Sequence, residues 1–103
     1  MITSKQRAYL RALANRIPTI CHIGKEGINP NFVKQISDAL DARELVKTHV
    51  LENAPCTPKE ACAELAELLL AEPVQVIGGR FVLYRQAKQP EKREIVLPKA
   101  NKK

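Results

Sequence analysis

Apolar residues recur along the chain with two spacings, and these spacings predict an alternation of helices and strands. In three segments they return every three or four positions, as on one face of a helix, and each segment opens with a residue that can cap a helix. Short β-branched or alternating runs between these segments are typical of strands. The predicted order over residues 3–84 is helix, strand, helix, strand, helix and a closing pair of strands, which indicates one α/β domain.

The first helix is predicted from Thr3-Ser4-Lys5-Gln6. In this capping box the Thr3 hydroxyl accepts a hydrogen bond from the backbone N–H of Gln6 while the Gln6 side chain reaches back. The helix should end within a residue or two of Pro18, because proline cannot continue a helix. A strand over residues 19–23 is expected to follow. The apolar stripe of the helix consists of Leu10, Leu13, Ala14 and Ile17.

The second helix is predicted to begin at Asn29, with Pro30 at the first helical position, where its missing N–H costs nothing. The strand expected over residues 45–51 is apolar on both sides, which indicates an inner strand of the sheet. The buried stripe of the second helix is expected to contain Phe32, Val33, Ile36 and Leu40.

The third helix is predicted from a second capping box, Thr57-Pro58-Lys59-Glu60, and is expected to end at Pro73. Residues 74–77 and 80–84, separated by Gly78-Gly79, predict a β-hairpin with a two-residue turn. The residues expected on the buried face of the helix are Ala61, Leu65, Leu68 and Leu69.

Residues 86–103 are polar and contain prolines, so we expect a basic, flexible tail after a domain formed by residues 1–85. Within this tail, residues 95–98 are apolar enough to dock transiently on the domain or on a partner. The chain has no apolar run long enough to cross a bilayer and no signal-peptide pattern. We therefore expect a cytoplasmic protein without membrane contact.

Charge is distributed unevenly. Residues 1–25 carry +5 with no acidic residue, residues 26–72 carry −5, and residues 73–103 carry +6, for a net charge of +6. A net positive charge favours a polyanionic partner but does not identify it.

Neither a catalytic nor a metal site is expected. Cys21, Cys56 and Cys62 show no Cys-x-x-Cys spacing, which argues against a zinc site and a disulfide framework. Cys21 and His22 are adjacent, but neighbouring residues of a regular strand point to opposite faces and cannot pair as nucleophile and base. His49 could lie nearby on the sheet, without a ligand spacing that supports a metal. We expect no enzyme activity and no cofactor.

Gly24-Lys25-Glu26-Gly27 lies between the first strand and the second helix. Glycines permit positive φ and close approach of another backbone, and the first turn of a helix offers N–H donors and a positive dipole end to an anion. The turn therefore has the features that a phosphate-binding loop needs, with Lys25 as a positive charge at its tip. Taken alone, however, the motif favours a plain structural turn, because four residues bounded by glycines form a weak motif.

Taken together, these motifs resemble the CRM domain, the chloroplast RNA splicing and ribosome maturation module, in its single-domain bacterial YhbY-like form. The similarity spans nearly the whole chain, and separated motifs in the same order are more specific than one glycine pair. The matching stretches are 3–7, 9–11, 23–28, 40–47, 76–85 and 92–98.

The resemblance implies a four-stranded mixed sheet with packed helices, similar to the C-terminal domain of translation initiation factor 3. It implies an RNA-binding protein that associates with precursors of the large ribosomal subunit, and therefore ribosomal RNA as the partner. Separately, we expect a monomer. It places RNA binding at Gly24, Lys25, Glu26 and Gly27. The candidates for a surrounding basic surface are Lys5, Arg7, Arg11, Arg16, Lys47, Arg80 and Arg85.

Loop contacts of this kind are expected to hold the RNA backbone without reading its sequence. Stacking on aromatic side chains is not expected, because Phe32 and Phe81 are assigned to the core. A protein-interaction adaptor is the alternative: the acidic middle of the chain, with the glutamates of the third helix, could dock a basic ribosomal protein while the glycine turn stays structural.

Overall fold

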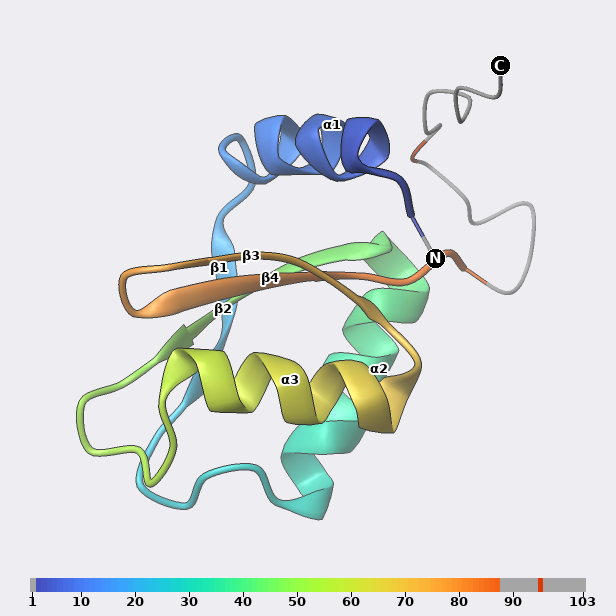
Figure 1. Ribbon diagram of the computed structural model, residues 1–103. Coiled ribbons are helices and arrows are strands. Elements are labelled where there is room, and N and C mark those ends of the chain that lie inside the picture. Colours follow the sequence, from blue (N-terminus) through green and yellow to red (C-terminus); the bar gives the residue numbers. More distant parts are fainter. Residues whose placement is uncertain (1, 88–94, 96–103) are drawn as a thin grey trace.

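Helices and strands alternate in the predicted order (Figure 1). The computed structural model describes residues 2–87 and residue 95. The helices are α1 (Ser4–Ala14), α2 (Pro30–Arg43) and α3 (Pro58–Leu69), and the strands are β1 (Thr19–Ile23), β2 (Leu45–Val50), β3 (Glu72–Ile77) and β4 (Arg80–Tyr84). No helix in this part of the chain has the length and apolar character needed to cross a membrane.

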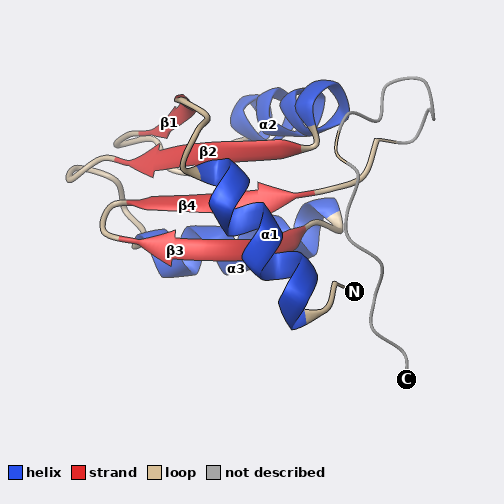
Figure 2. Cartoon of the chain, turned by 90° about the horizontal axis from the view of Figure 1, so that it is seen from above, coloured by secondary structure: helices blue, strands red, loops and turns tan. Residues whose placement is uncertain are grey.

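The strands form one mixed sheet in the order β1-β2-β4-β3 (Figure 2). β1 and β2 are parallel, while β4 pairs antiparallel with both β2 and β3. A parallel pair needs a long crossover, and α2 supplies it between β1 and β2. β2 is an inner strand, which confirms the expectation from its two apolar sides. The fold is therefore the mixed α+β class with a four-stranded sheet.

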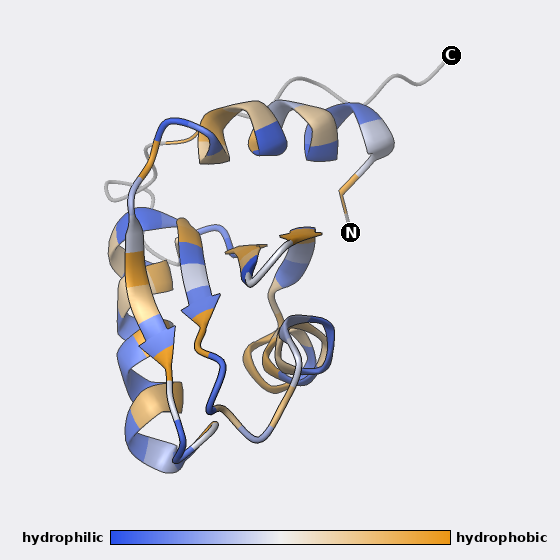
Figure 3. Cartoon of the chain, turned by 90° about the vertical axis from the view of Figure 1, so that its left-hand side faces the viewer, coloured by the Kyte–Doolittle hydropathy of each residue, from blue (hydrophilic) through white to orange (hydrophobic). Residues whose placement is uncertain are grey.

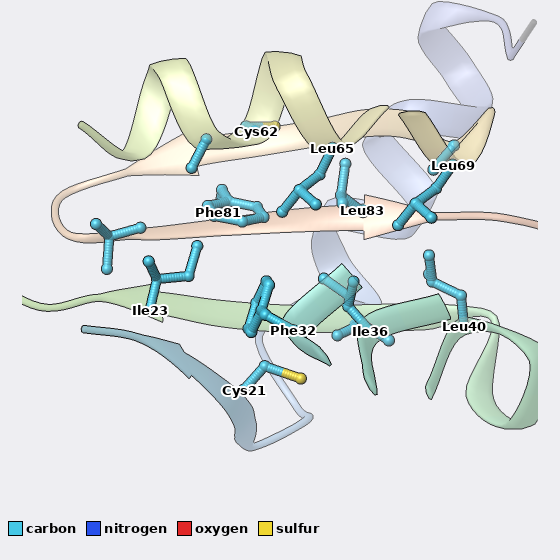
Figure 4. Close-up of a cluster of buried hydrophobic side chains, with 14 residues drawn as sticks. Cys21, Ile23, Phe32, Ile36, Leu40, Cys62, Leu65, Leu69, Phe81 and Leu83 are labelled. Carbon is cyan, nitrogen blue, oxygen red and sulfur yellow. The ribbon is translucent and has the colours of Figure 1, made fainter. Parts of the chain in front are cut away.

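Helices cover both faces of the sheet, but unequally. α2 and α3 pack on one face and α1 crosses the other (Figures 1 and 3). The larger core lies under α2 and α3, where Phe81, Ile36 and Leu65 are fully buried (Figure 4). The smaller core lies under α1 and consists of Leu10, Ala14, Leu45, Val74, Val82 and Tyr84.

All three predicted helix starts are confirmed by hydrogen bonds. Thr3 Oγ1 accepts from the Gln6 N–H at 3.1 Å, and the Thr3 N–H donates to Gln6 Oε1 at 3.0 Å. Thr57 and Glu60 form the same reciprocal pair at 3.1 and 3.0 Å. Asn29 Oδ1 accepts from the Phe32 N–H at 2.8 Å, directly before Pro30. These bonds satisfy N–H groups that lack a partner inside the helix.

Two predicted helix ends lie further along the chain than the observed ones. α1 ends at Ala14, and the Arg16 N–H donates to the Leu13 carbonyl in a tight turn before Pro18. α3 ends at Leu69 because Leu70 adopts a left-handed conformation with φ 54°. Pro73 does not stop the helix; it is the second residue of β3, which therefore begins two residues before the predicted strand.

The predicted buried face of α3 is wrong at one position. Leu68 is 56% exposed, while Cys62 is buried beside Ala61, Leu65 and Leu69. The helix is turned so that positions 61, 62, 65 and 69 meet the sheet and α2. Leu68 instead borders the groove between α2 and α3.

A buried carboxylate holds the chain beyond β4. Glu44 is fully buried between α2 and β2, with φ 67°. Its Oε2 accepts from the Ala87 N–H at 2.8 Å, and its Oε1 accepts from the Ile95 N–H at 2.9 Å. Ile95 packs against the smaller core. The rest of the predicted tail, with residues 96–98 of its apolar stretch, lies outside the described residues.

Candidate functional site

The glycine turn directly follows β1 and is closed by a hydrogen bond from the Gly27 N–H to the Gly24 carbonyl, at 2.9 Å. Gly27 has φ 66°, and a Cβ there would lie 2.8 Å from Pro55 Cγ. Both the backbone conformation and the neighbouring proline therefore require glycine at this position. Gly27 is buried, so its role is to shape the turn.

Gly24 differs from Gly27. A Cβ at Gly24 would meet Leu51 Cδ1 at 3.8 Å, an ordinary contact distance, and its φ lies outside the left-handed region. The fold can therefore accept a side chain there. The absence of one leaves the backbone open to close approach from outside, which is the second use of glycine at a binding loop.

The start of α2 arranges the polar groups of the turn. Asn29 Nδ2 donates to Glu26 Oε1 at 3.3 Å, which holds this carboxylate toward the helix start. Lys25 is exposed at the tip of the turn. The positive end of the α2 dipole points at the same place, so this end of the molecule favours an anion.

A hollow of about 370 Å³ opens beside the turn. Besides the turn itself, its walls contain His22 of β1 and Asn31 and Gln35 of α2. Sequence reasoning did not assign these three residues to the site. A signal was available for two of them, because residues four apart share a helix face, and Asn31 and Gln35 follow the glycine turn at that spacing.

The sheet face that carries α1 has a polar end next to the turn. His22, His49 and Arg80 are successive register partners across β1, β2 and β4. The two imidazole rings lie edge to face with centroids 5.9 Å apart. Arg80 Nε donates to Thr19 Oγ1 at 3.2 Å. Cys21 is buried on the opposite face of β1, which confirms that it does not pair with His22.

The basic candidates fall into three groups: two residues on the sheet, four on or just after α1, and Arg85 after β4. Lys47 and Arg80 are on the polar sheet face, because Lys47 is two residues before His49 on β2. The second group, on or just after α1, consists of Lys5, Arg7, Arg11 and Arg16. Within it Arg7 Nε donates to the Pro73 carbonyl at 3.2 Å, which ties α1 to β3. Lys5, Arg11 and Arg16 are exposed.

Arg85 has a structural environment. Its guanidinium donates to the Leu69 carbonyl at 3.1 Å, to the carbonyl and hydroxyl oxygens of Ser37 at 2.9 and 3.1 Å, and to Asp41 Oδ1 at 3.0 Å. Only 15% of the side chain is exposed. These contacts join the end of α3 to α2. We therefore do not count Arg85 among the residues of the RNA-binding surface.

The cysteines are free thiols with different environments. Cys21 and Cys62 are buried in the larger core, and Cys56 is partly exposed in the loop before α3. Burial raises the pKa of Cys62 to about 11 and also raises the pKa of Cys21. Burial, with Glu60 and Glu64 nearby, raises the pKa of Cys56. A raised thiol pKa disfavours the reactive thiolate. Among residues 2–87 and 95, no three side chains that could hold a metal ion come together.

Three known proteins are similar to this chain over 95% of its length. A Bacillus subtilis protein named "Probable RNA-binding protein YqeI" is 40% identical over 98 residues, which cover 95% of this chain and all of that protein. A Haemophilus influenzae protein named "RNA-binding protein" is 29% identical over 95% of this chain and 96% of its own length. The solution structure of SAV1595 from Staphylococcus aureus matches with a TM-score of 0.76 and 49% identity, over 95% of this chain and all of that one.

The match to a family model is as extensive as these pairwise similarities. It covers residues 2–85, from the residue before the first capping box to the end of the β3–β4 hairpin and the arginine after it. It therefore includes every helix and strand described above. The chain belongs to the CRS1/YhbY (CRM) domain family.

Proposed function

We propose that this protein binds ribosomal RNA during assembly of the large ribosomal subunit and holds the RNA backbone with the Gly24–Gly27 turn. The observation that carries the proposal is Gly24, a glycine that the fold does not require, at the entrance to a polar hollow and beside the positive end of α2. Two relatives are named as RNA-binding proteins, which supports RNA as the class of polymer that this protein binds. The role in assembly rests on the resemblance of the chain to YhbY-like proteins.

The proposed contacts favour the RNA backbone. Backbone N–H groups and Lys25 suit phosphate oxygens, which position an RNA without reading its sequence. Lys5, Arg11 and Arg16 of the α1 region, with Lys47 and Arg80 on the sheet, widen the positive surface. Each phosphate contact adds about 0.7 to 0.9 to the salt slope, so about four to six contacts predict an affinity loss of about 50-fold or more for a fourfold rise in salt.

The first experiment measures affinity for large-subunit ribosomal RNA fragments across a salt series. Gly24→Asp places a negative charge at the loop without backbone strain, and we expect an affinity loss of about tenfold or more, since it adds a repulsive charge where a phosphate should bind. Gly24→Asn has nearly the same size and no charge, so it should lose less. A substitution at Gly27 is unsuited, because the contact with Pro55 would disturb the turn itself.

Ala63→Asp is the matched control, because it adds the same charge at an exposed position of α3, a helix that does not line the hollow beside the turn. Its affinity should stay near that of the natural protein. If Gly24→Asp binds as tightly as the natural protein, or if both aspartates weaken binding equally, the turn is only structural and the clamp is rejected.

The assembly role is tested in cells. The natural protein should sediment with precursors of the large subunit, and Gly24→Asp should leave that fraction while remaining folded. Absence of the natural protein from these precursors would reject the assembly role and leave the RNA clamp to be decided by the binding series.

An adaptor that docks a basic ribosomal protein is the second candidate. The observation in its favour is the outward surface of α3, where Glu64 and Glu67 lie near the exposed side chains of Leu68 and Leu70. Retention of the partner protein after nuclease treatment, and its loss on Glu64→Arg, would support this candidate.

A further inference from the structure

The chain contains two histidines, and the fold brings them side by side next to the glycine turn. We propose that His22, His49 and Arg80 form a strip that contacts RNA phosphates adjoining those held by the turn, and that the two imidazoles make these contacts in their protonated form. This inference rests on the proposed RNA clamp and adds a second contact surface and a dependence on pH to it.

The position of the strip follows from the register of the sheet. His22 pairs with His49, His49 pairs with Arg80, and Ile77 of β3 completes the row. The neighbours Cys21, Val50 and Phe81 belong to the larger core, so the row must point to the opposite face. On that face the buried contacts of α1 involve Leu45, Val74, Val82 and Tyr84, which lie at the other end of the strands. The row therefore lies beyond the area that α1 covers.

The strip is continuous with the turn. His22 lines the hollow that also contains Gly24, Lys25 and Gly27. Gly79 on the β3–β4 turn comes close to His49, because a Cβ there would lie 3.4 Å from the ring. An RNA strand that leaves the turn toward the sheet would first meet His22, then His49 and then Arg80.

The charged groups around the two rings are mostly positive. Lys47 is two residues away on β2, Arg80 faces His49 from β4, and Lys25 lies at the hollow beside His22. Glu26 is the acidic side chain that lines the same hollow, and Asn29 holds it toward the start of α2. A bound phosphate would place a negative charge beside the rings and favour the charged imidazole, so RNA binding and proton uptake favour each other.

The expected size follows from counterion release. A slope of about 0.7 per phosphate contact corresponds to about fivefold in affinity for each contact at about 0.1 M salt. Imidazole ordinarily gains its proton between about pH 8 and pH 5. Two protonated rings should therefore raise the affinity by about tenfold or more between about pH 8 and pH 5.5, and they should steepen the salt slope by about one.

The test uses a uridine oligonucleotide, because uracil has no group that gains a proton in this range. Affinity is measured at about pH 8 and pH 5.5 over a salt series. The natural protein should show the gain and the steeper slope. The double variant His22→Gln and His49→Gln should show no gain: its affinity at the lower pH should equal its own affinity at the higher one. Arg80→Gln should weaken binding at both pH values and should keep the gain.

Two controls make the result decisive. Arg43→Gln removes an exposed positive charge at the opposite end of α2, about 20 Å from the turn by helix length, and should keep the full pH response.

The two imidazole Cε1–H signals in NMR spectra should reach their titration midpoints at higher pH when the oligonucleotide is bound. Midpoints that do not move, or a pH gain that survives in the double histidine variant, would overturn the strip. Salt-dependent binding without a pH response would overturn the strip alone, whereas no binding at any pH would overturn both the strip and the clamp.

Discussion

α1 and α3 begin in the same way and have opposite outer surfaces. Both start from a threonine capping box, and they pack on opposite faces of one sheet (Figure 1). α1 carries no acidic residue, whereas α3 carries Glu60, Glu64 and Glu67 against one lysine. The caps and the apolar stripes determine that both helices form and where they pack. Exposed charges outside the caps and stripes, such as Arg11 on α1 and Glu64 on α3, are therefore free to distinguish a surface that suits RNA from one that does not.

The two faces also differ in how completely they are covered. α2 and α3 together bury the larger core, which contains 14 buried residues, while α1 alone buries six. A single helix cannot cover a four-stranded sheet, and the uncovered end carries the histidine strip. We therefore assign stability mainly to the core under α2 and α3, and binding to the uncovered end of the sheet together with the turn that follows β1.

The largest expected effect tests where stability lies. Phe81 and Val82 are adjacent on β4 and point into the larger and the smaller core, respectively. Phe81→Ala should lower the free energy of unfolding by about 3 to 5 kcal/mol, because it removes an aromatic ring from a buried site and leaves a cavity. Val82→Ala should cost about 1 to 2 kcal/mol, since fewer atoms are lost. Urea unfolding measures both, and equal losses would contradict the division between the faces.

The next prediction reverses charge on each face. Arg11→Glu on α1 should weaken RNA binding by about tenfold and lower the salt slope by about one, because a phosphate contact becomes a repulsion. Glu64→Arg on α3 changes charge by the same amount with the opposite sign and should alter affinity by less than about threefold. Filter binding or fluorescence anisotropy measures both. A larger effect from the α3 variant would place the RNA on the wrong face for our proposal.

The two capping boxes provide a smaller and matched test. Thr3→Ala and Thr57→Ala should each lower the free energy of unfolding by about 1 kcal/mol, because each leaves a helix N–H without its acceptor. Thr3→Ala should also weaken RNA binding, since it loosens the helix that carries Lys5 and Arg11. Thr57→Ala should leave binding of the folded protein unchanged. If both variants bound RNA alike, α1 would have no special part in binding.

The smallest effect concerns the thiols under the α2–α3 face. The pKa of Cys62 is raised by burial to about 11, so near neutral pH almost none of it is thiolate. Alkylation of the folded protein should therefore modify the more exposed Cys56 first. Its rate should keep rising with pH above the ordinary thiol range, because burial and two nearby glutamates raise the pKa of Cys56. Mass spectrometry after timed labelling identifies the site. Early modification of Cys62 would show that the larger core opens readily.

Local signals in the sequence predicted the fold well. Thr3, Asn29 and Thr57 each cap the helix that follows, because a cap depends on a side chain and an N–H only three residues apart. The hairpin turn at Gly78-Gly79 is equally local, with Gly78 at φ 59°. The apolar character of both sides of β2 indicated its inner place, because only an inner strand under helices buries both faces.

Features that depend on packing or register were not predictable. The rotation of α3, which exposes Leu68 and buries Cys62, is determined by α2 and the sheet rather than by helical spacing alone. The histidine strip joins residues from three strands, and only the sheet register shows that they are neighbours. From the sequence, Arg85 was expected to be a surface charge, yet its guanidinium donates to oxygens of residues that are 16 and 48 positions away. The difference between Gly24 and Gly27 likewise depends on Pro55, which is distant in sequence.

The buried carboxylate of Glu44 bears on how this domain could be transplanted. The family match ends at residue 85, but Glu44 accepts hydrogen bonds from the backbone of Ala87 and Ile95. A chain cut after Arg85 would take these two donors away from a fully buried acidic group, which is a costly change. We expect a graft into another protein to fold well only if it carries about ten residues beyond the recognised motif. The segment that must be transferred for folding is then longer than the segment that sequence similarity defines.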